Sequence, residues 1–272
     1  MAPLRYLIPC GVVLLATCAK YPSEPGFDNP VIPGDPNYEA PQTTILSGPA
    51  EASVIDSHTV TFVWAGNRNE MQFTYQLNET SWSGWNTDTS MALQYLDEGA
   101  YTFAVKGRYI SGVEEDLAVS RAFTIDDIHG PALRLYPRLK QTGLFMSNSL
   151  EIMLEEVTDV MIVAVTLSFD PAKLEVNQIE VYVDERSILK TSGGTVIPFW
   201  SIDNSAGTAS VDVATVTGSP AGVSGTGAIA KIYFTAKGSG QFIISAEESS
   251  IRDPSNNEIT ITEFVGALVT IK

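Results

Sequence analysis

Few residues in this 272-residue chain have the type and spacing that catalysis or metal binding requires. The two histidines, His58 and His129, belong to no metal-binding spacing, and neither lies beside a nucleophile motif. His58 falls in a polar turn and His129 in a junction, so both are expected at the surface. The G-x-S-x-G, phosphate-loop and H-E-x-x-H motifs do not occur. The sequence therefore gives no positive indication of an enzyme.

Carboxylates are the other residues that could do chemistry. Glu155–Glu156 and Glu247–Glu248 are adjacent pairs, and neighbours in a strand point to opposite faces, so neither pair makes a two-carboxylate site by itself. A glycosidase site assembled from distant strands remains open at this stage. The run Asp253–Glu258 offers clustered oxygen ligands for calcium but lacks EF-hand spacing. A hairpin turn between Ile251 and Ile259 explains it as well, and we favour the turn.

Both cysteines, Cys10 and Cys18, lie in residues 1–19, which have the pattern of a secretory leader. A basic residue precedes an apolar stretch that is too short to span a bilayer comfortably. Leu15–Cys18 resembles a bacterial lipobox, in which the cysteine becomes the lipidated first residue, although threonine replaces the usual Gly, Ala or Ser before it. The alternative is ordinary cleavage after Ala19. We favour lipidation of Cys18, because a lone cysteine here has no other evident use.

Residues 20–44 are rich in proline and are expected to form a tether in extended polyproline II conformation. A lipid followed by such a spacer would hold a receptor clear of a membrane. The expected location is the cell envelope, where the lipid anchors the chain to the outer membrane or the cell surface, facing outward or into the periplasm. Alanine rather than aspartate after Cys18 suits the outer membrane.

The composition indicates acidic, globular β domains. Hydrophobic residues make up 44% of the chain, the mean hydropathy is +0.07, and no long segment has helical apolar spacing. Period-two alternation and frequent turn residues predict an all-β fold. The net charge is −16, from 32 acidic and 16 basic residues, which argues against binding to nucleic acid. Beyond Cys18 there is no cysteine, so the folded part has no disulfide and no thiolate metal site.

Residues 45–127 show one set of alternating strands. The segments FVWAG, FTYQL, LDEGAYTFAVKGRY and RAFTID resemble the fibronectin-III-like and immunoglobulin-like modules of bacterial surface proteins. The resemblance implies a β-sandwich but no particular function, since such modules are often spacers.

Trp82 and Trp85, in the segment SWSGW, could bind carbohydrate, because sugar-binding modules stack pyranose rings on exposed aromatic side chains. The alternative is that one or both tryptophans pack over the edge of the sandwich. We favour packing, because tryptophans are usually largely buried.

Residues 131–272 contain a second set of strands. Val163, Val165, Leu167 and Phe169 alternate with smaller or polar residues, and Asp170-Pro171 ends that strand. The segments LSFDPAKLEV (167–176) and VSGTGAIAKIYFTAK (223–237) together resemble the cohesin family. In the second segment we expect a Gly-rich turn at 223–227 followed by a strand. Between the two segments, residues 202–207 are expected to form a hairpin turn. The predicted fold is therefore two tandem β-sandwiches, the second a cohesin-like jelly roll.

The cohesin resemblance implies a non-catalytic receptor that presents the face of a sheet to a partner. If Val163, Val165 and Leu167 point inward, the side chains that alternate with them in residues 161–168 point outward. The same holds in residues 209–216 if Val211 and Val213 point inward. An apolar outward patch rimmed by polar groups usually marks an interface. The alternative is that another strand, a loop or the first domain covers this face. In the best-known cohesins this strand displays polar residues, whereas here its outward positions near the start are apolar. The predicted partner-binding residues are Ile162, Ala164, Thr166, Ser210, Asp212 and Ala214.

The expected function is surface-anchored binding of a dockerin-type module on a secreted protein, which in turn could act on polysaccharide. The chain itself needs no cofactor, and any calcium would come with the partner dockerin. Two alternatives stay open. One is direct carbohydrate binding, which an exposed aromatic row on a flat sheet would support. The other is a structural spacer of the cell envelope.

Overall fold

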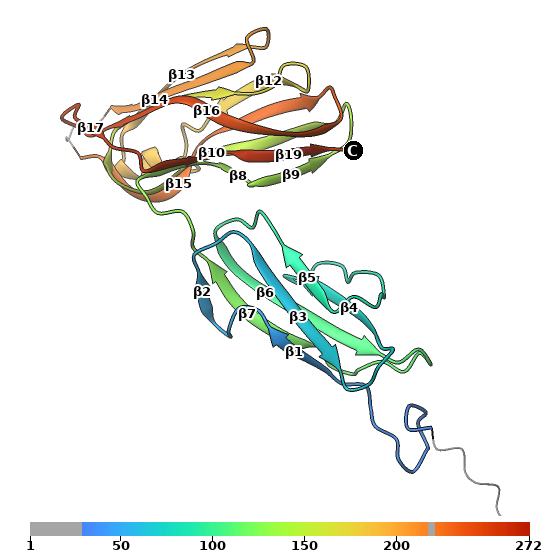
Figure 1. Ribbon diagram of the computed structural model, residues 1–272. Helices are drawn as coiled ribbons and strands as arrows, with labels where there is room; N and C mark the ends of the chain where they lie inside the picture. The colour runs from blue at the N-terminus through green and yellow to red at the C-terminus, as the bar shows by residue number, and fades with distance from the viewer. Residues whose placement is uncertain (1–28, 217–220) are drawn as a thin grey trace, which may run out of the picture. The chain divides into compact units, whose positions relative to one another are not determined.

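The computed structural model describes residues 29–216 and 221–272, in which strands predominate (Figure 1). The leader, Cys18 and the first part of the expected tether lie outside these residues. No helix within the described ranges is long and apolar enough to cross a membrane. Backbone proximity divides the chain into two compact units, residues 1–40 and 41–272.

The described part of residues 1–40 forms turns, which differs from the extended tether expected there. The Asp35 carboxylate accepts hydrogen bonds from the backbone N–H groups of Asn29 and Asn37, both at 2.8 Å. The N–H of Glu39 donates to the carbonyl oxygen of Pro30 at 3.0 Å and closes the segment. The Asp35 side chain thus stabilises the turn by accepting backbone hydrogen bonds, as aspartate commonly does.

The first sandwich contains a three-stranded and a four-stranded sheet, with strand orders β1-β3-β5 and β2-β7-β6-β4 (Figure 1). The strands are β1 (Thr43–Ser47), β2 (Ser53–Ile55), β3 (Val60–Gly66), β4 (Gln72–Leu77), β5 (Ser90–Leu93), β6 (Gly99–Arg108) and β7 (Val119–Ile125). Its core is aromatic. Phe62 stacks on Phe103 with ring centroids 4.0 Å apart, and Trp64 and Phe123 pack around this pair.

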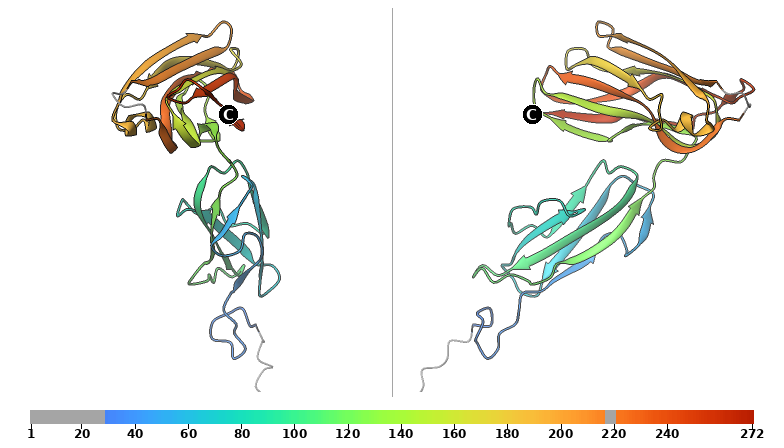
Figure 2. Two further views of the ribbon diagram at one scale, coloured as in Figure 1. Left: turned by 90° about the vertical axis from the view of Figure 1, so that its left-hand side faces the viewer. Right: turned by 180° about the vertical axis from the view of Figure 1, so that it is seen from behind.

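The second sandwich packs a five-stranded sheet, ordered β12-β15-β10-β8-β18, against a second sheet ordered β13-β14-β11-β16-β19-β9 with β17 paired to β16 (Figure 2). The strands are β8 (Ala132–Tyr136), β9 (Leu139–Thr142), β10 (Ser147–Val160), β11 (Ile162–Ser168), β12 (Leu174–Val181), β13 (Thr195–Asp203), β14 (Thr208–Val216), β15 (Val223–Ala236), β16 (Gly240–Arg252), β17 (Glu258–Ile259), β18 (Glu263–Val265) and β19 (Ala267–Ile271). A short 3-10 helix, η1 (Ile188–Ser192), precedes β13. The all-β prediction is confirmed.

Alternation places the core of this sandwich as the sequence indicates. Val163, Val165 and Leu167 of β11 are buried in one cluster with Val211 and Val213 of β14. The hairpin turn predicted at residues 202–207 lies between β13 and β14. There the carboxylate of Asp203 accepts two backbone hydrogen bonds at 2.9 Å.

The Gly-rich turn expected at residues 223–227 is wrong, because these residues are the first part of β15 and pair with β10. A Cβ on Gly227 would lie 2.8 Å from the Cβ of Ile188 in η1. Glycine is therefore present so that η1 can pack closely against the strand, and it does not mark a chain reversal.

The burial of β11 gives a stability prediction. Leu167→Ala should lower the free energy of unfolding by about 2–5 kcal/mol, because it leaves a cavity in a close-packed core. Thr166→Ala, one residue away on the outward face, should change it by about 0.5 kcal/mol or less. Urea unfolding of both variants measures the difference. Equal losses would contradict the assignment of inner and outer faces.

Candidate partner-binding face

Strand β11 is hydrogen-bonded on both sides, to β14 and to β16, and so lies in the middle of its sheet. Ile162 pairs with Ala214, Ala164 with Asp212, and Thr166 with Ser210. All of them alternate with the buried residues of the same strands. The structure therefore places the six predicted binding residues together on the face turned away from the core, where Asp212 is exposed and the others are half-buried.

Strand β13 extends this face, although the sequence pattern predicted no strand at these residues. Ile197 pairs with Ala214, Phe199 with Asp212, and Ser201 with Ser210. The Phe199 side chain is 66% exposed, an unusual position for a phenylalanine. The alternation was hidden because apolar residues occupy both sides of β13, where Trp200 follows Phe199 and is also exposed. Pro198 lies between Ile197 and Phe199, as is tolerated in an edge strand.

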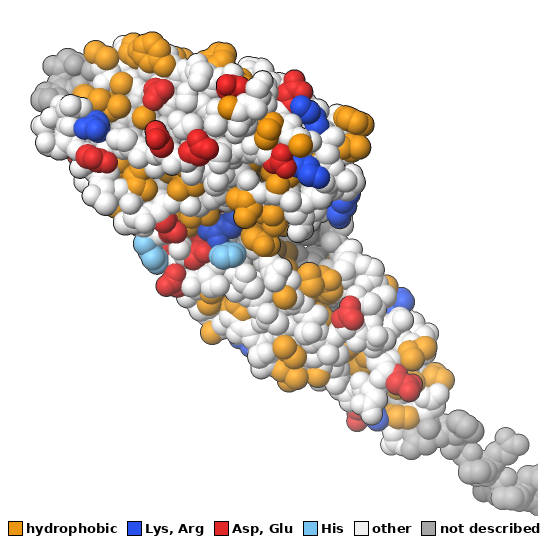
Figure 3. Space-filling model, turned by 45° about the horizontal axis from the view of Figure 1, so that its top comes forward, with side chains coloured by type: hydrophobic (Ala, Val, Ile, Leu, Met, Phe, Trp, Pro, Cys, Tyr) orange, Lys and Arg blue, Asp and Glu red, His pale blue; other side chains and the backbone are white. Residues whose placement is uncertain are grey.

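Strand β16 borders the other side of β11 and adds charge. Arg252, Ser250 and Glu248 pair with Ile162, Ala164 and Thr166, so they share the outward face. A shallow depression of about 510 Å³ lies over β11 and its neighbours. Its lining residues are Ala164, Val165, Thr166, Asp212, Glu247, Glu248, Ser249 and Ser250. Figure 3 shows acidic side chains spread among polar and apolar ones on the second sandwich. Three carboxylates, those of Asp212, Glu247 and Glu248, make the depression acidic.

Glu247 and Glu248 both line this depression, contrary to the expectation that they face opposite ways. Thr166 pairs with Glu248 and Leu167 with Ala246, so Glu247 is the extra residue of a β-bulge. Glu155 and Glu156 do behave as expected. Glu155 is buried beside Arg134, with 2.6 Å between the carboxylate and Nε, whereas Glu156 is exposed.

The calcium candidate forms the turn that we favoured. Both carboxylate oxygens of Asp253 accept hydrogen bonds from Asn257, one from its backbone N–H at 2.8 Å and one from Nδ2 at 2.9 Å. The carboxylate thus serves the chain reversal between β16 and β17. Among residues 29–216 and 221–272, no group of three or more His, Cys, Asp and Glu side chains is arranged to hold a metal ion.

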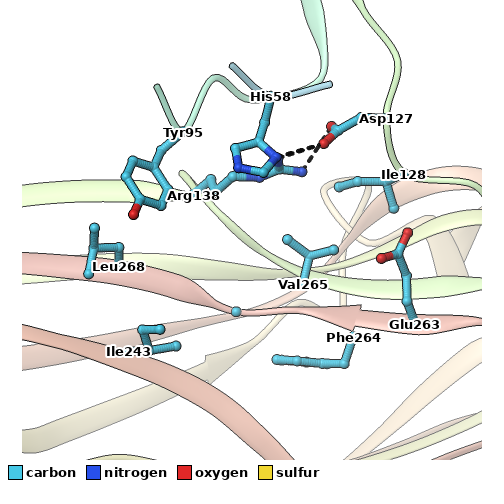
Figure 4. A pocket seen from close by; sticks show the side chains of 11 residues that line it. His58, Tyr95, Asp127, Ile128, Arg138, Ile243, Glu263, Phe264, Val265 and Leu268 are labelled. Carbon is cyan, nitrogen blue, oxygen red and sulfur yellow. Dashed lines mark hydrogen bonds and ion pairs between the residues drawn. The ribbon is translucent and has the colours of Figure 1, made fainter. Parts of the chain in front are cut away.

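A second pocket, of about 420 Å³, has mainly apolar walls (Figure 4). Tyr95, Ile243, Phe264 and Leu268 are among the residues that line it. Its polar groups bind one another. Arg138, 5% exposed, donates from Nη1 and Nη2 to Asp127 at 2.9 and 3.0 Å, and His58 Nδ1 lies 3.1 Å from the same carboxylate. These side chains stabilise the fold around residue 127. His129, by contrast, pairs with Asp56 at the surface, at 3.3 Å.

The pKa values of the carboxyl groups around Arg138 are shifted in opposite directions. Burial disfavours ionisation of Asp127, but hydrogen bonds from Arg138, Glu98 and His58 outweigh it and lower the pKa of Asp127 to about 2. Burial, together with the hydrogen bond to Asp127, raises the pKa of Glu98 to about 7. Burial also raises the pKa of Asp97, which accepts a bond from the backbone N–H of Arg138 at 2.7 Å.

These shifts predict a pH dependence of stability. Between pH 4.5 and about pH 7 the unfolded chain releases the Glu98 proton while the folded chain retains it, so the contribution of Glu98 to the free energy of unfolding falls as the pH rises. Asp127 acts in the opposite sense, and its contribution is lost as the pH falls from 3.8 through about 2. In urea unfolding, Glu98→Gln should make the free energy of unfolding depend less steeply on pH between pH 4.5 and about pH 7. Glu70→Gln, on an exposed loop, is the control, and an unchanged slope in Glu98→Gln would refute the assignment.

Three comparisons with known proteins were made, and only the comparison with solved structures finds matches. No protein-family model matches the sequence, and a search of curated proteins finds no match. Among solved structures, the chain is similar to cohesin domains. The sixth cohesin of scaffoldin B from Acetivibrio cellulolyticus, solved with a Cel5 dockerin, matches at a TM-score of 0.44 and 15% identity, over 53% of this chain and 100% of its own.

Two further matches have the same character. A type I cohesin–dockerin complex from Clostridium thermocellum matches at a TM-score of 0.43 and 14% identity, over 52% of this chain and 98% of its own. A non-cellulosomal cohesin from the archaeon Archaeoglobus fulgidus matches at 0.41 and 12%, over 52% and 90%. Identities this low concern the fold alone and do not specify a partner.

Proposed function

We propose that this protein is a non-catalytic receptor and that the outward face of β13, β14, β11 and β16 binds a dockerin-type module of another protein. The observation that carries the proposal is the composition of that face. Phe199 and Ile197 of β13 are exposed, and the half-buried apolar side chains of Ile162 and Ala164 lie on the same face, one strand further on. Polar and charged side chains surround this patch, and such an arrangement usually marks a protein interface.

Electrostatics favours a partner that brings basic groups. Asp212, Glu247 and Glu248 line the depression on this face, so a lysine or arginine of the partner would find carboxylates there. Arg252 lies at one end of the face and donates from Nη1 to the carbonyl oxygen of Asn256 at 3.1 Å, which leaves other N–H groups for an acidic or carbonyl group of the partner. Phe199 would be the aromatic anchor, since large exposed aromatics at interfaces commonly contribute most of the binding free energy.

The solved cohesins that were crystallised with dockerins support the choice of partner class. By this proposal any calcium belongs to the partner, and the partner's own activity could be directed at polysaccharide. Direct carbohydrate binding on the same face has less support. Phe199 is the only aromatic residue at the outward positions that β13, β14, β11 and β16 share, and a single ring does not make an aromatic row.

The proposal predicts the effect of two substitutions on binding. Ile162→Asp and Phe199→Ala should each weaken capture of the partner by about 30-fold, which corresponds to about 2 kcal/mol. The first places a carboxylate in the apolar patch, and the second removes the anchor. Trp200→Ala is a matched control, because Trp200 is exposed on the opposite side of the same strand.

The measurement is a pull-down from the organism's secreted proteins, followed by titration of the recovered partner. Thermal melts of all four proteins show whether each variant is folded. Recovery of the same partner in equal amount by folded Ile162→Asp and Phe199→Ala would place the interface elsewhere. Loss of folding in Ile162→Asp would show that this face is buried, and Phe199→Ala would then decide the question.

We also propose that a lipid on Cys18 anchors the chain to the cell envelope, through the segment that ends near residue 44. The support is the leader pattern with a cysteine at its end. Cys18→Ala should release the protein from the membrane fraction into the soluble fraction, as immunoblotting of fractionated cells would show. Cys10→Ala, within the same leader, should leave the distribution unchanged. Retention of Cys18→Ala in the membrane would contradict lipid anchoring.

A further inference from the structure

The segment Ser81–Asn86 of the first sandwich is fixed along the edge of β4. Phe73 pairs with Asn86 across a single β-bridge. Ser83 donates its N–H to the carbonyl oxygen of Tyr75 at 2.8 Å, and its hydroxyl accepts the N–H of Tyr75 at 3.0 Å. Thr74 donates its hydroxyl to the carbonyl oxygen of Ser83 at 2.7 Å. Hydrogen bonds at Ser83, between the two tryptophans, and the bridge at Asn86, just after Trp85, therefore hold the segment that carries the two rings.

Both tryptophans meet cations from β6. Lys106 and Arg108 point away from the core, since they alternate with buried residues of that strand. The Arg108 guanidinium lies 4.4 Å from the centre of the Trp85 ring. The Lys106 ammonium lies 5.6 Å from the Trp85 ring and 5.7 Å from the Trp82 ring. Packing therefore explains Trp85, which is half-buried, but the Trp82 side chain is 39% exposed.

The two cations are held in place, which suits them to recognise an anion. Arg108 donates from Nε to the side-chain oxygen of Gln72 at 2.9 Å, and its plane is fixed by the Trp85 ring. A guanidinium fixed in this way presents its Nη edge as a rigid fork for a planar carboxylate. Glu114 is the charged group opposite. Its carboxylate is 3.0 Å from Lys106 Nζ and 3.9 Å from Arg108 Nη1, too long for a hydrogen bond to the arginine.

We propose that Trp82, Lys106 and Arg108 form a binding site for a carboxylate-bearing sugar of an acidic polysaccharide. The exposed Trp82 ring would pack against the C–H face of the sugar ring. Arg108 would bind the carboxylate through its Nη edge, and Lys106 would supply the second charge, exchanging its exposed contact with Glu114. The two cations indicate an anionic ligand. Residues 41–127 contain four Lys and Arg residues, namely Arg68, Lys106, Arg108 and Arg121. Two of these, Lys106 and Arg108, meet at the Trp85 ring, and Lys106 also lies 5.7 Å from the exposed Trp82 ring.

The test measures binding of the full chain to polygalacturonate by affinity electrophoresis, with carboxyl-reduced polygalacturonate as the uncharged counterpart. The wild type should bind only the carboxylate form, and added salt should weaken binding. Trp82→Ala and Arg108→Gln should each weaken binding by about tenfold or more, the loss expected for a charge-assisted contact or a stacked ring. Circular dichroism melts confirm that the variants are folded.

Two matched variants show whether binding depends on this site or on the charge and exposed tryptophans of the protein in general. Arg121→Gln makes the same change in net charge on β7, and Trp200→Ala removes an exposed tryptophan from the second sandwich. Both should bind as the wild type does. Equal losses in Arg121→Gln and Arg108→Gln would overturn the proposal, as would absence of wild-type binding. Binding of dextran sulfate but not of polygalacturonate would overturn the carboxylate assignment. This site lies outside the outward face of β13, β14, β11 and β16. The outcome of these binding tests therefore does not change the result expected in the partner pull-down.

Discussion

Burial of the inner side chains of β11 is the constraint on which the binding surface depends. Val163, Val165 and Leu167 lie in the core of the second sandwich, and β14 and β16 bond to the strand on either side. A shift of one residue in register would exchange the two faces of the strand, so the cost of exposing these side chains fixes the register. The positions of Ile162, Ala164 and Thr166 on the outside follow from that burial. Ile162 and Ala164 are apolar although the core does not require apolar side chains at these outward positions.

The parts of the structure that could be predicted from the sequence are those set by local patterns, such as strand alternation and turn residues. The alternation in β11 and β14 placed six outward residues correctly relative to the core, because a period of two is set by the strand itself. The turn at 202–207 was likewise predictable from Asp203 and Gly207, whose roles depend on neighbours along the chain. Strand β13 was missed because exposed apolar residues on both of its sides resemble neither a half-buried strand nor a loop.

The features that escaped prediction depend on contacts between distant segments. Gly227 is needed because η1 packs against β15, and no local pattern reveals that approach. The bulge that turns Glu247 into the same depression as Glu248 is a property of the pairing with β11. The ion pairs of Glu155 with Arg134 and of Asp127 with Arg138 join residues from different strands or segments. In each case the tertiary pairing decides which face or partner a side chain has, and the sequence records only its type.

Pro198 has a consequence for how these molecules behave when crowded together. Strand β13 ends its sheet, and its free edge carries the backbone groups that a strand from a neighbouring molecule could recruit. Proline has no N–H, so a ladder built on that edge would be interrupted near its middle, beside Phe199. The strand can therefore display an aromatic side chain to solvent while its backbone discourages the open-ended self-association that leads to fibres.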